Sequence, residues 1–152
     1  MKRNFAIAMI VWLIFPISTH AAEIAISNNS PLAFGSFAAG SGGTVTVSPS
    51  GMCSGSGDVI VVIADCAAAE FTVTGDPNFT YFIDLPADNF VTLTGPGSDM
   101  NITQFTSNPA GANGQLGAGG SQNLTVGGTL NVGNNQAPGS YTGNFTIIVD
   151  YN

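Results

Sequence analysis

The sequence predicts an all-β domain with the architecture of an immunoglobulin-like β-sandwich, and three observations support this prediction. Short stretches in which apolar and polar residues alternate recur from about residue 23 to the end of the chain. Glycine and proline, with 20 and 8 residues in the chain, separate these stretches. No stretch of useful length beyond the first 21 residues shows the apolar period of an amphipathic helix. Many short strands divided by turn residues are typical of two packed sheets.

Residues 1–21 have the pattern of a secretory signal peptide. Lys2 and Arg3 precede an apolar run, and small residues follow it up to Ala21. The apolar run is shorter than the roughly 20 residues that span a bilayer, which disfavours the alternative of an uncleaved membrane anchor. We expect cleavage after Ala21 and a single domain over residues 22–152, exported through the periplasm and then secreted or held at the cell surface.

The predicted mature chain is acidic and lacks basic side chains. Lys2, Arg3 and the single His20 lie in the leader, whereas all nine acidic residues follow it. Nucleic acids and anionic membrane surfaces are bound through basic groups, so both classes of partner are excluded. No later apolar run reaches membrane-spanning length, so we expect no membrane insertion after cleavage.

The first half of the mature chain predicts four strands between turn residues. Alternation marks the first three of them, and a continuous apolar run marks the fourth. Gly35 lies inside the second strand, where a glycine favours a bulge or a close approach of another segment. Glycine-rich stretches at residues 40–43 and 55–57 predict turns. The expected strands are residues 23–26, 31–37, 44–47 and 59–63.

The second half continues in the same way. β-branched and aromatic residues form each expected strand, and glycine or proline follows most of them. Residues 109–120 predict a long loop with room for a short edge strand, because Leu116 is its only large apolar residue. The pair Gly127 and Gly128 predicts a bulge. The expected strands are residues 71–74, 79–83, 90–94, 100–105, 124–132 and 141–151.

The last of these segments carries the clearest pattern. From residue 141 onward every second residue is apolar or glycine, which predicts a long strand with one buried face. The alternate positions are Tyr141, Gly143, Phe145, Ile147, Val149 and Tyr151. A strand with an apolar face and an open edge invites association, so we expect this edge to be paired or to bind a partner.

Two cysteines, Cys53 and Cys66, follow the leader. An even number of cysteines in an exported chain predicts one disulfide, which would contribute roughly 3 kcal/mol by restricting the unfolded chain. The alternative is a reactive thiol, but the mature chain offers no basic side chain to lower its pKa.

Catalytic groups are scarce. Without histidine or lysine, a serine or threonine lacks its usual activating base, so we expect no enzymatic activity and no cofactor. Asp84 and Asp88 are the nearest pair of carboxylates, and aspartates at such turns usually shape the turn. The remaining candidates for a calcium site are dispersed, which favours solvated turn acids. These candidates are Asp58, Asp65, Glu70, Asp76 and Asp99.

The ending of the chain resembles the C-terminal motif of chaperone–usher pilins. The motif joins a penultimate tyrosine, a glycine fourteen positions from the end and alternating apolar residues between them. Leu32, Phe34 and Gly35, together with the closing segment, are also similar to a family of secreted bacterial domains without assigned function. Spore-coat U proteins and archaic pilin subunits share a similar opening and ending. The residues that match the motif are Gly139, Phe145, Ile147, Val149 and Tyr151.

The resemblance implies a pilin-like sandwich that assembles into a surface fibre by donor-strand complementation, with a periplasmic chaperone and an usher as partners. It implies an acceptor edge at the five residues of the C-terminal motif and a donor segment over residues 22–28, with Ile24 and Ile26 as plugs. Head-to-tail addition of identical subunits builds a filament. The alternative is that residues 23–26 pair within their own subunit, which describes a self-contained secreted adhesin or carbohydrate-binding module.

Overall fold

The structure is a computed structural model and describes residues 22–152, apart from the side chains of Ile63 and Ala64. The predicted signal peptide, residues 1–21, lies outside the described residues. Strands, loops and one short 3-10 helix, η1 (Gly111–Asn113), make up this part of the chain, so the all-β prediction is confirmed. Within residues 22–152 no helix is long and apolar enough to cross a membrane.

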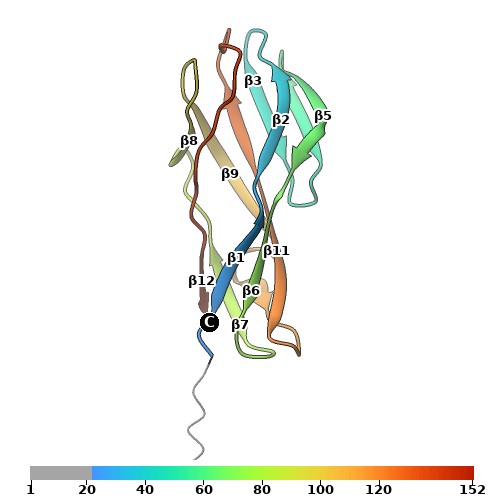
Figure 1. The fold of residues 1–152 in the computed structure, drawn as a ribbon, viewed down its shortest axis with the longest axis vertical. Coiled ribbons are helices and arrows are strands. Elements are labelled where there is room, and N and C mark those ends of the chain that lie inside the picture. Colours follow the sequence, from blue (N-terminus) through green and yellow to red (C-terminus); the bar gives the residue numbers. More distant parts are fainter. Residues whose placement is uncertain (1–21) are drawn as a thin grey trace, which may run out of the picture.

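The largest sheet has seven strands arranged around a long central strand (Figure 1). One edge of β11 pairs with β6 and β3, which lead to β1 and β4, and its other edge pairs with β9, which leads to β8. The strands are β1 (Ala25–Ser30), β3 (Gly43–Val47), β4 (Cys53–Gly57), β6 (Ala69–Thr74), β8 (Val91–Leu93), β9 (Met100–Asn108) and β11 (Ser121–Val132).

Two small sheets lie over the large one, near its opposite ends (Figure 1). At the top of the view, β2 (Ala33–Ala38) pairs with β5 (Ile60–Ala67). At the bottom, β7 (Thr80–Asp84) pairs with β12 (Ile148–Tyr151) on one side and with β10 (Gly114–Gln115) on the other. All of these pairs are antiparallel.

The apolar faces of these layers form two buried clusters. The upper cluster lies under β2 and includes Phe34, Val45, Met100, Ile102 and Leu130. The lower cluster lies under β7 and β12 and includes Phe71, Tyr81, Leu124, Ile147 and Val149. Phe145 contacts both clusters from the chain that connects them. The predicted alternation therefore marks the buried faces, because successive side chains of a strand point to opposite sides.

The two bulges predicted from glycines inside strands are confirmed. The pairing of β2 with β5 shifts register between Phe34 and Ser36, and Gly35 has a φ of +71° there. A Cβ on Gly35 would lie 2.9 Å from the Cys66 sulfur, so the position also needs a residue without a side chain. In β11 the register shifts between Gly127 and Thr129.

The predicted disulfide between Cys53 and Cys66 is present. Cys53 lies in β4 of the large sheet and Cys66 lies in β5 of the upper small sheet. The bridge therefore ties the two layers together at the upper end of the molecule, which the cysteine count alone did not indicate.

The sequence interpretation missed one strand and underestimated the extent of several others. The strand expected over residues 59–63 continues to Ala67, and the one expected over residues 100–105 continues to Asn108. Residues 55–57, expected as a turn, belong to β4, whose serines and glycines pair with β3 and are largely exposed. Such a strand carries no apolar alternation because neither of its faces is buried. The first strand, expected over residues 23–26, continues through the polar residues up to Ser30 because its pairing with β6 extends that far.

The long C-terminal strand is the main correction. The expected strand over residues 141–151 forms a sheet ladder only in β12, and Thr142 adds an isolated bridge to Thr94. The pairing that sets Ile148 opposite Asp84 would set Thr146 opposite Pro86, and proline has no N–H to donate. The side chains nevertheless alternate as predicted, since Ile147 and Val149 are buried and Thr146 and Ile148 are exposed.

Candidate functional site

A groove of about 1120 Å³ lies at the upper end of the molecule, between β2 and the chain that leads to β12. One wall is residues 31–39 and the other is residues 136–145, and every residue of both runs lines it. We call this feature the β2 groove. Nine residues of extended chain span roughly 30 Å, so the β2 groove has the length of an ordinary strand.

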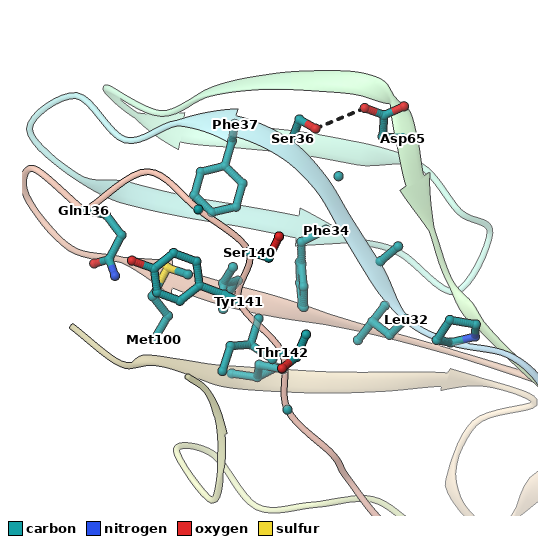
Figure 2. A pocket seen from close by; sticks show the side chains of 18 of the residues that line it. Leu32, Phe34, Ser36, Phe37, Asp65, Met100, Gln136, Ser140, Tyr141 and Thr142 are labelled. Carbon is teal, nitrogen blue, oxygen red and sulfur yellow. Dashed lines mark hydrogen bonds between the residues drawn. The ribbon is translucent and has the colours of Figure 1, made fainter. Parts of the chain in front are cut away.

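The first wall of the groove is an unpaired strand edge. β2 is hydrogen-bonded to β5 on one side, and no other described strand pairs with it. Figure 2 shows Phe34 and Phe37 pointing from β2 into the groove, whereas the Ser36 side chain turns toward β5 and donates a 3.1 Å hydrogen bond to Asp65 Oδ2. The main-chain groups along this edge are therefore available to another strand.

The second wall is extended chain without a continuous ladder. Among the described residues, residues 136–147 make main-chain hydrogen bonds to other main-chain groups only at Thr142, whose N–H and C=O pair with Thr94 at 3.0 and 2.9 Å. Gly143 lies against β8 so closely that a Cβ there would be 2.3 Å from Thr92 O. The segment thus follows β8 on one side and faces the groove on the other.

The floor between the walls is apolar. It comes from the large sheet and consists of buried or half-buried side chains of β8, β9 and β11. These side chains are Val91, Leu93, Met100, Ile102 and Leu130. An apolar floor between two extended edges suits an inserted strand whose alternate side chains point downward.

Tyr141 holds the upper part of the second wall. Its hydroxyl accepts a 2.9 Å hydrogen bond from Gly97 N and donates a 2.8 Å hydrogen bond to Ala137 O. The ring packs against the upper cluster, and a Cβ on Gly95 would lie 2.5 Å from the ring. These contacts hold residues 136–145 in place although their main chain makes few hydrogen bonds.

The structure divides the predicted acceptor residues between two places. Gly139 and Phe145 line the β2 groove. Ile147 and Val149 are buried in the lower cluster, 8 % exposed each, under the β7–β12 pair. Tyr151 packs against the same cluster. The sequence pattern gave no sign that β2 forms the opposite wall, because pairing partners are set by the tertiary arrangement.

The predicted donor residues lie against their own subunit. β1 pairs with β6 and places Ile26 opposite Val73. Ile24 and Ile26 are half-buried against the lower cluster. In this arrangement the segment belongs to the large sheet, so a donor role in a neighbouring subunit would require β1 to leave β6.

Several acidic side chains accept hydrogen bonds from neighbouring segments of the domain. Asp88 Oδ1 accepts a 2.6 Å hydrogen bond from Gln104 N, and Asp58 accepts one from Ser41. Asp76 Oδ1 accepts a 3.0 Å hydrogen bond from Ala22 N. Within residues 22–152, no three acidic, histidine or cysteine side chains gather in a way that could hold a metal ion.

Tyr81 is the titratable group whose environment is most altered. It is buried in the lower cluster, and its hydroxyl donates a 2.7 Å hydrogen bond to Gln122 Oε1. Burial removes water from the phenol and raises the pKa of Tyr81 above the ordinary value of 10.0. This group stabilises the closed lower end and lies away from the β2 groove.

The chain belongs to the family described as "Domain of unknown function (DUF4402)", which matches residues 24–151. The match covers nearly all of the described chain, from just before β1 to the end of β12. No curated protein and no solved structure matches the chain significantly.

Proposed function

We propose that this chain is a structural surface protein, a fimbrial or pilin-like subunit that assembles by donor-strand complementation. In this proposal the domain is an immunoglobulin-like β-sandwich that lacks one strand, and the β2 groove receives that strand from another chain. The chain would be exported through the periplasm, where a chaperone and an usher handle it, and would end in a homo-oligomeric fibre at the cell surface.

The observation that carries the proposal is the groove between two extended edges. β2 has one unpaired edge, and residues 136–145 face it across an apolar floor. A strand inserted there would gain main-chain hydrogen bonds from both walls and would bury alternate side chains against Leu93 and Met100. The resemblance of the ending to pilins, spore-coat U proteins and archaic pilin subunits supports the same assignment.

The test uses oligomers of the exported chain, analysed in SDS without heating. We expect a ladder of oligomers from the natural sequence, because strand insertion makes assemblies that resist SDS until they are heated. Leu93→Glu places a charge on the half-buried groove floor and should abolish the ladder. Deletion of residues 22–27 should also abolish it if the donor is the first strand.

The matched control is Ile60→Glu. Ile60 is 73 % exposed on β5, outside the groove, so the same charge there should leave the ladder unchanged. Circular dichroism and an intact disulfide would show that each variant is folded. A ladder that persists in folded Leu93→Glu would contradict the proposal.

The alternative is a self-contained secreted adhesin or carbohydrate-binding module. The pairing of β1 with its own β6 favours it, because the N-terminal segment is then used inside the subunit. This alternative predicts a monomer before and after heating, and glycan-array binding that Leu93→Glu does not change.

A further inference from the structure

The first described residue is held by a closed ring of three hydrogen bonds. Ala22 N donates to Asp76 Oδ1 at 3.0 Å, and Asp76 N donates to the Tyr151 hydroxyl at 2.7 Å. The Tyr151 hydroxyl in turn donates to Ala22 O at 3.0 Å. We call Ala22, Asp76 and Tyr151 the N-terminal clasp. It joins the start of the chain, the β6–β7 turn and the last strand.

Two of the three members are positioned by the fold itself. Tyr151 ends β12, and its ring packs edge-on against Phe79 with the ring centres 5.5 Å apart. Asp76 follows Gly75, whose N–H donates a 2.9 Å hydrogen bond to Gly120 O. A Cβ on Gly75 would lie 2.2 Å from the Tyr151 hydroxyl, so the turn is shaped around this tyrosine.

The composition of residues 22–152 makes the charge of the Ala22 nitrogen unusual. Residues 22–152 contain nine acidic side chains and no lysine, arginine or histidine. Cleavage after Ala21, the site expected from the leader, would leave the α-ammonium of Ala22 as the single cationic group of the mature chain. In the uncleaved precursor the same nitrogen is an uncharged amide. A hydrogen bond between an ammonium and a carboxylate is stronger than one from an amide.

We propose that cleavage after Ala21 strengthens the N-terminal clasp, by placing the new α-ammonium on the Asp76 carboxylate and so holding β1 more firmly on β6. Maturation then stabilises the start of the first strand. Asp76 is half-buried and Ala22 is exposed, so solvent partly screens the ion pair, and its strength is that of a modest surface pair.

One consequence rests on the proposed function. β1 contains the predicted donor residues, so a closed clasp keeps the donor strand in its own subunit, and its opening governs when β1 can enter the β2 groove of a neighbour. Variants that break the clasp should therefore form the SDS-resistant ladder faster than the natural chain.

The absence of lysine after the leader gives a selective experiment. An amine-acetylating reagent can react only with the α-amine of the mature chain, and mass spectrometry of the product identifies residue 22 as its site. The clasped amine should react slowly. In Asp76→Asn the reaction should be about fivefold faster, the factor expected for a modest ion pair. Tyr151→Phe keeps the carboxylate but removes the hydroxyl that bridges Ala22 and Asp76, so its reaction should be faster by a smaller factor.

Two control variants make the same chemical changes elsewhere. Tyr141→Phe removes a hydroxyl that also accepts one hydrogen bond and donates another, at the other end of the C-terminal segment. Asp84→Asn removes an exposed carboxylate at the far end of β7. Both should be acetylated at the rate of the natural chain.

A second measurement separates the charge from the fold. Acetylation keeps an N–H on Ala22 but removes its charge, so it should lower the melting temperature by about 2–4 °C and reduce hydrogen-exchange protection in β1. In Asp76→Asn acetylation should change neither quantity. Equal acetylation rates in all variants, or a mature chain that does not begin at Ala22, would overturn the proposal.

These outcomes are distinct from those that test the proposed function. The acetylation and exchange measurements use the monomer, so Leu93→Glu should behave in them as the natural chain does. If both measurements support the N-terminal clasp but the chain never forms a ladder, the role proposed for Ala22 stands and the proposed fibre is rejected.

Discussion

The two halves of the C-terminal segment share one sequence pattern and adopt different structures. In residues 141–145 the inward-facing side chains line the β2 groove, and the main chain forms a single bridge to Thr94. In β12 the inward-facing side chains are buried and the main chain pairs with β7. Alternation therefore reports which face is buried, whereas the presence of a neighbouring edge decides whether a ladder forms.

The same contrast holds for the two ends of the molecule. The lower cluster is enclosed by β7 and β12 and closed further by the N-terminal clasp. The upper cluster is covered by β2 and β5 on one side, and the β2 groove runs beside them. The upper end also carries the disulfide, a covalent tie that the lower end lacks among residues 22–152.

The largest expected effect comes from two matched leucine-to-alanine substitutions, each of which would create a cavity in one of the two clusters. Leu124 and Leu130 are both 0 % exposed, on the same strand, and belong to the lower and upper clusters. Leucine-to-alanine changes cost about 2–5 kcal/mol, and less where the surroundings can relax. In urea unfolding we expect Leu124→Ala to lie near the upper limit, and Leu130→Ala lower because the open groove lets its neighbours move. Equal losses would remove the contrast between the ends.

The disulfide offers the next effect. Replacing Cys53 and Cys66 together with alanine should lower the free energy of unfolding by about 3 kcal/mol, because the bridge closes a loop of 13 residues. Hydrogen exchange should show the loss of protection first in β2 and β5, at the upper end. A uniform loss over β7 and β12 as well would show that the two ends unfold as one unit.

The smallest effect concerns Tyr81 in the closed end. Its raised pKa means that the folded chain keeps the phenol proton at a pH where the unfolded chain, with a pKa near 10, has lost it. Stability should therefore fall as the pH rises above about 10. Tyr81→Phe should remove this slope while costing about 1 kcal/mol at neutral pH, for one hydrogen bond. Denaturant titrations at pH 8 and pH 11 would measure both quantities, and an unchanged slope in the variant would contradict the assignment.

Much of the fold was predictable because strand patterns are local. The alternation at β3, β6, β7 and β11 gave their positions closely, and the glycines inside β2 and β11 gave the bulges. β4 was not predictable in this way, since a strand exposed on both faces has no apolar period. Only one wall of the β2 groove was predicted in part, since Gly139 and Phe145 were among the expected residues. The other wall, β2, was not predicted.

By itself, the sequence determined which residues of most strands face inward, where most of the turns fall, that the two cysteines pair, and that residues 22–152 are acidic without any basic side chain. These properties follow from side-chain period and composition, which each segment carries alone. Only the tertiary structure decided that β1 pairs with β6, that Pro86 ends the β7–β12 ladder, and that Ala22 meets Asp76 and Tyr151. Such pairings depend on which edges meet in space, and a sequence period contains no information about its partner.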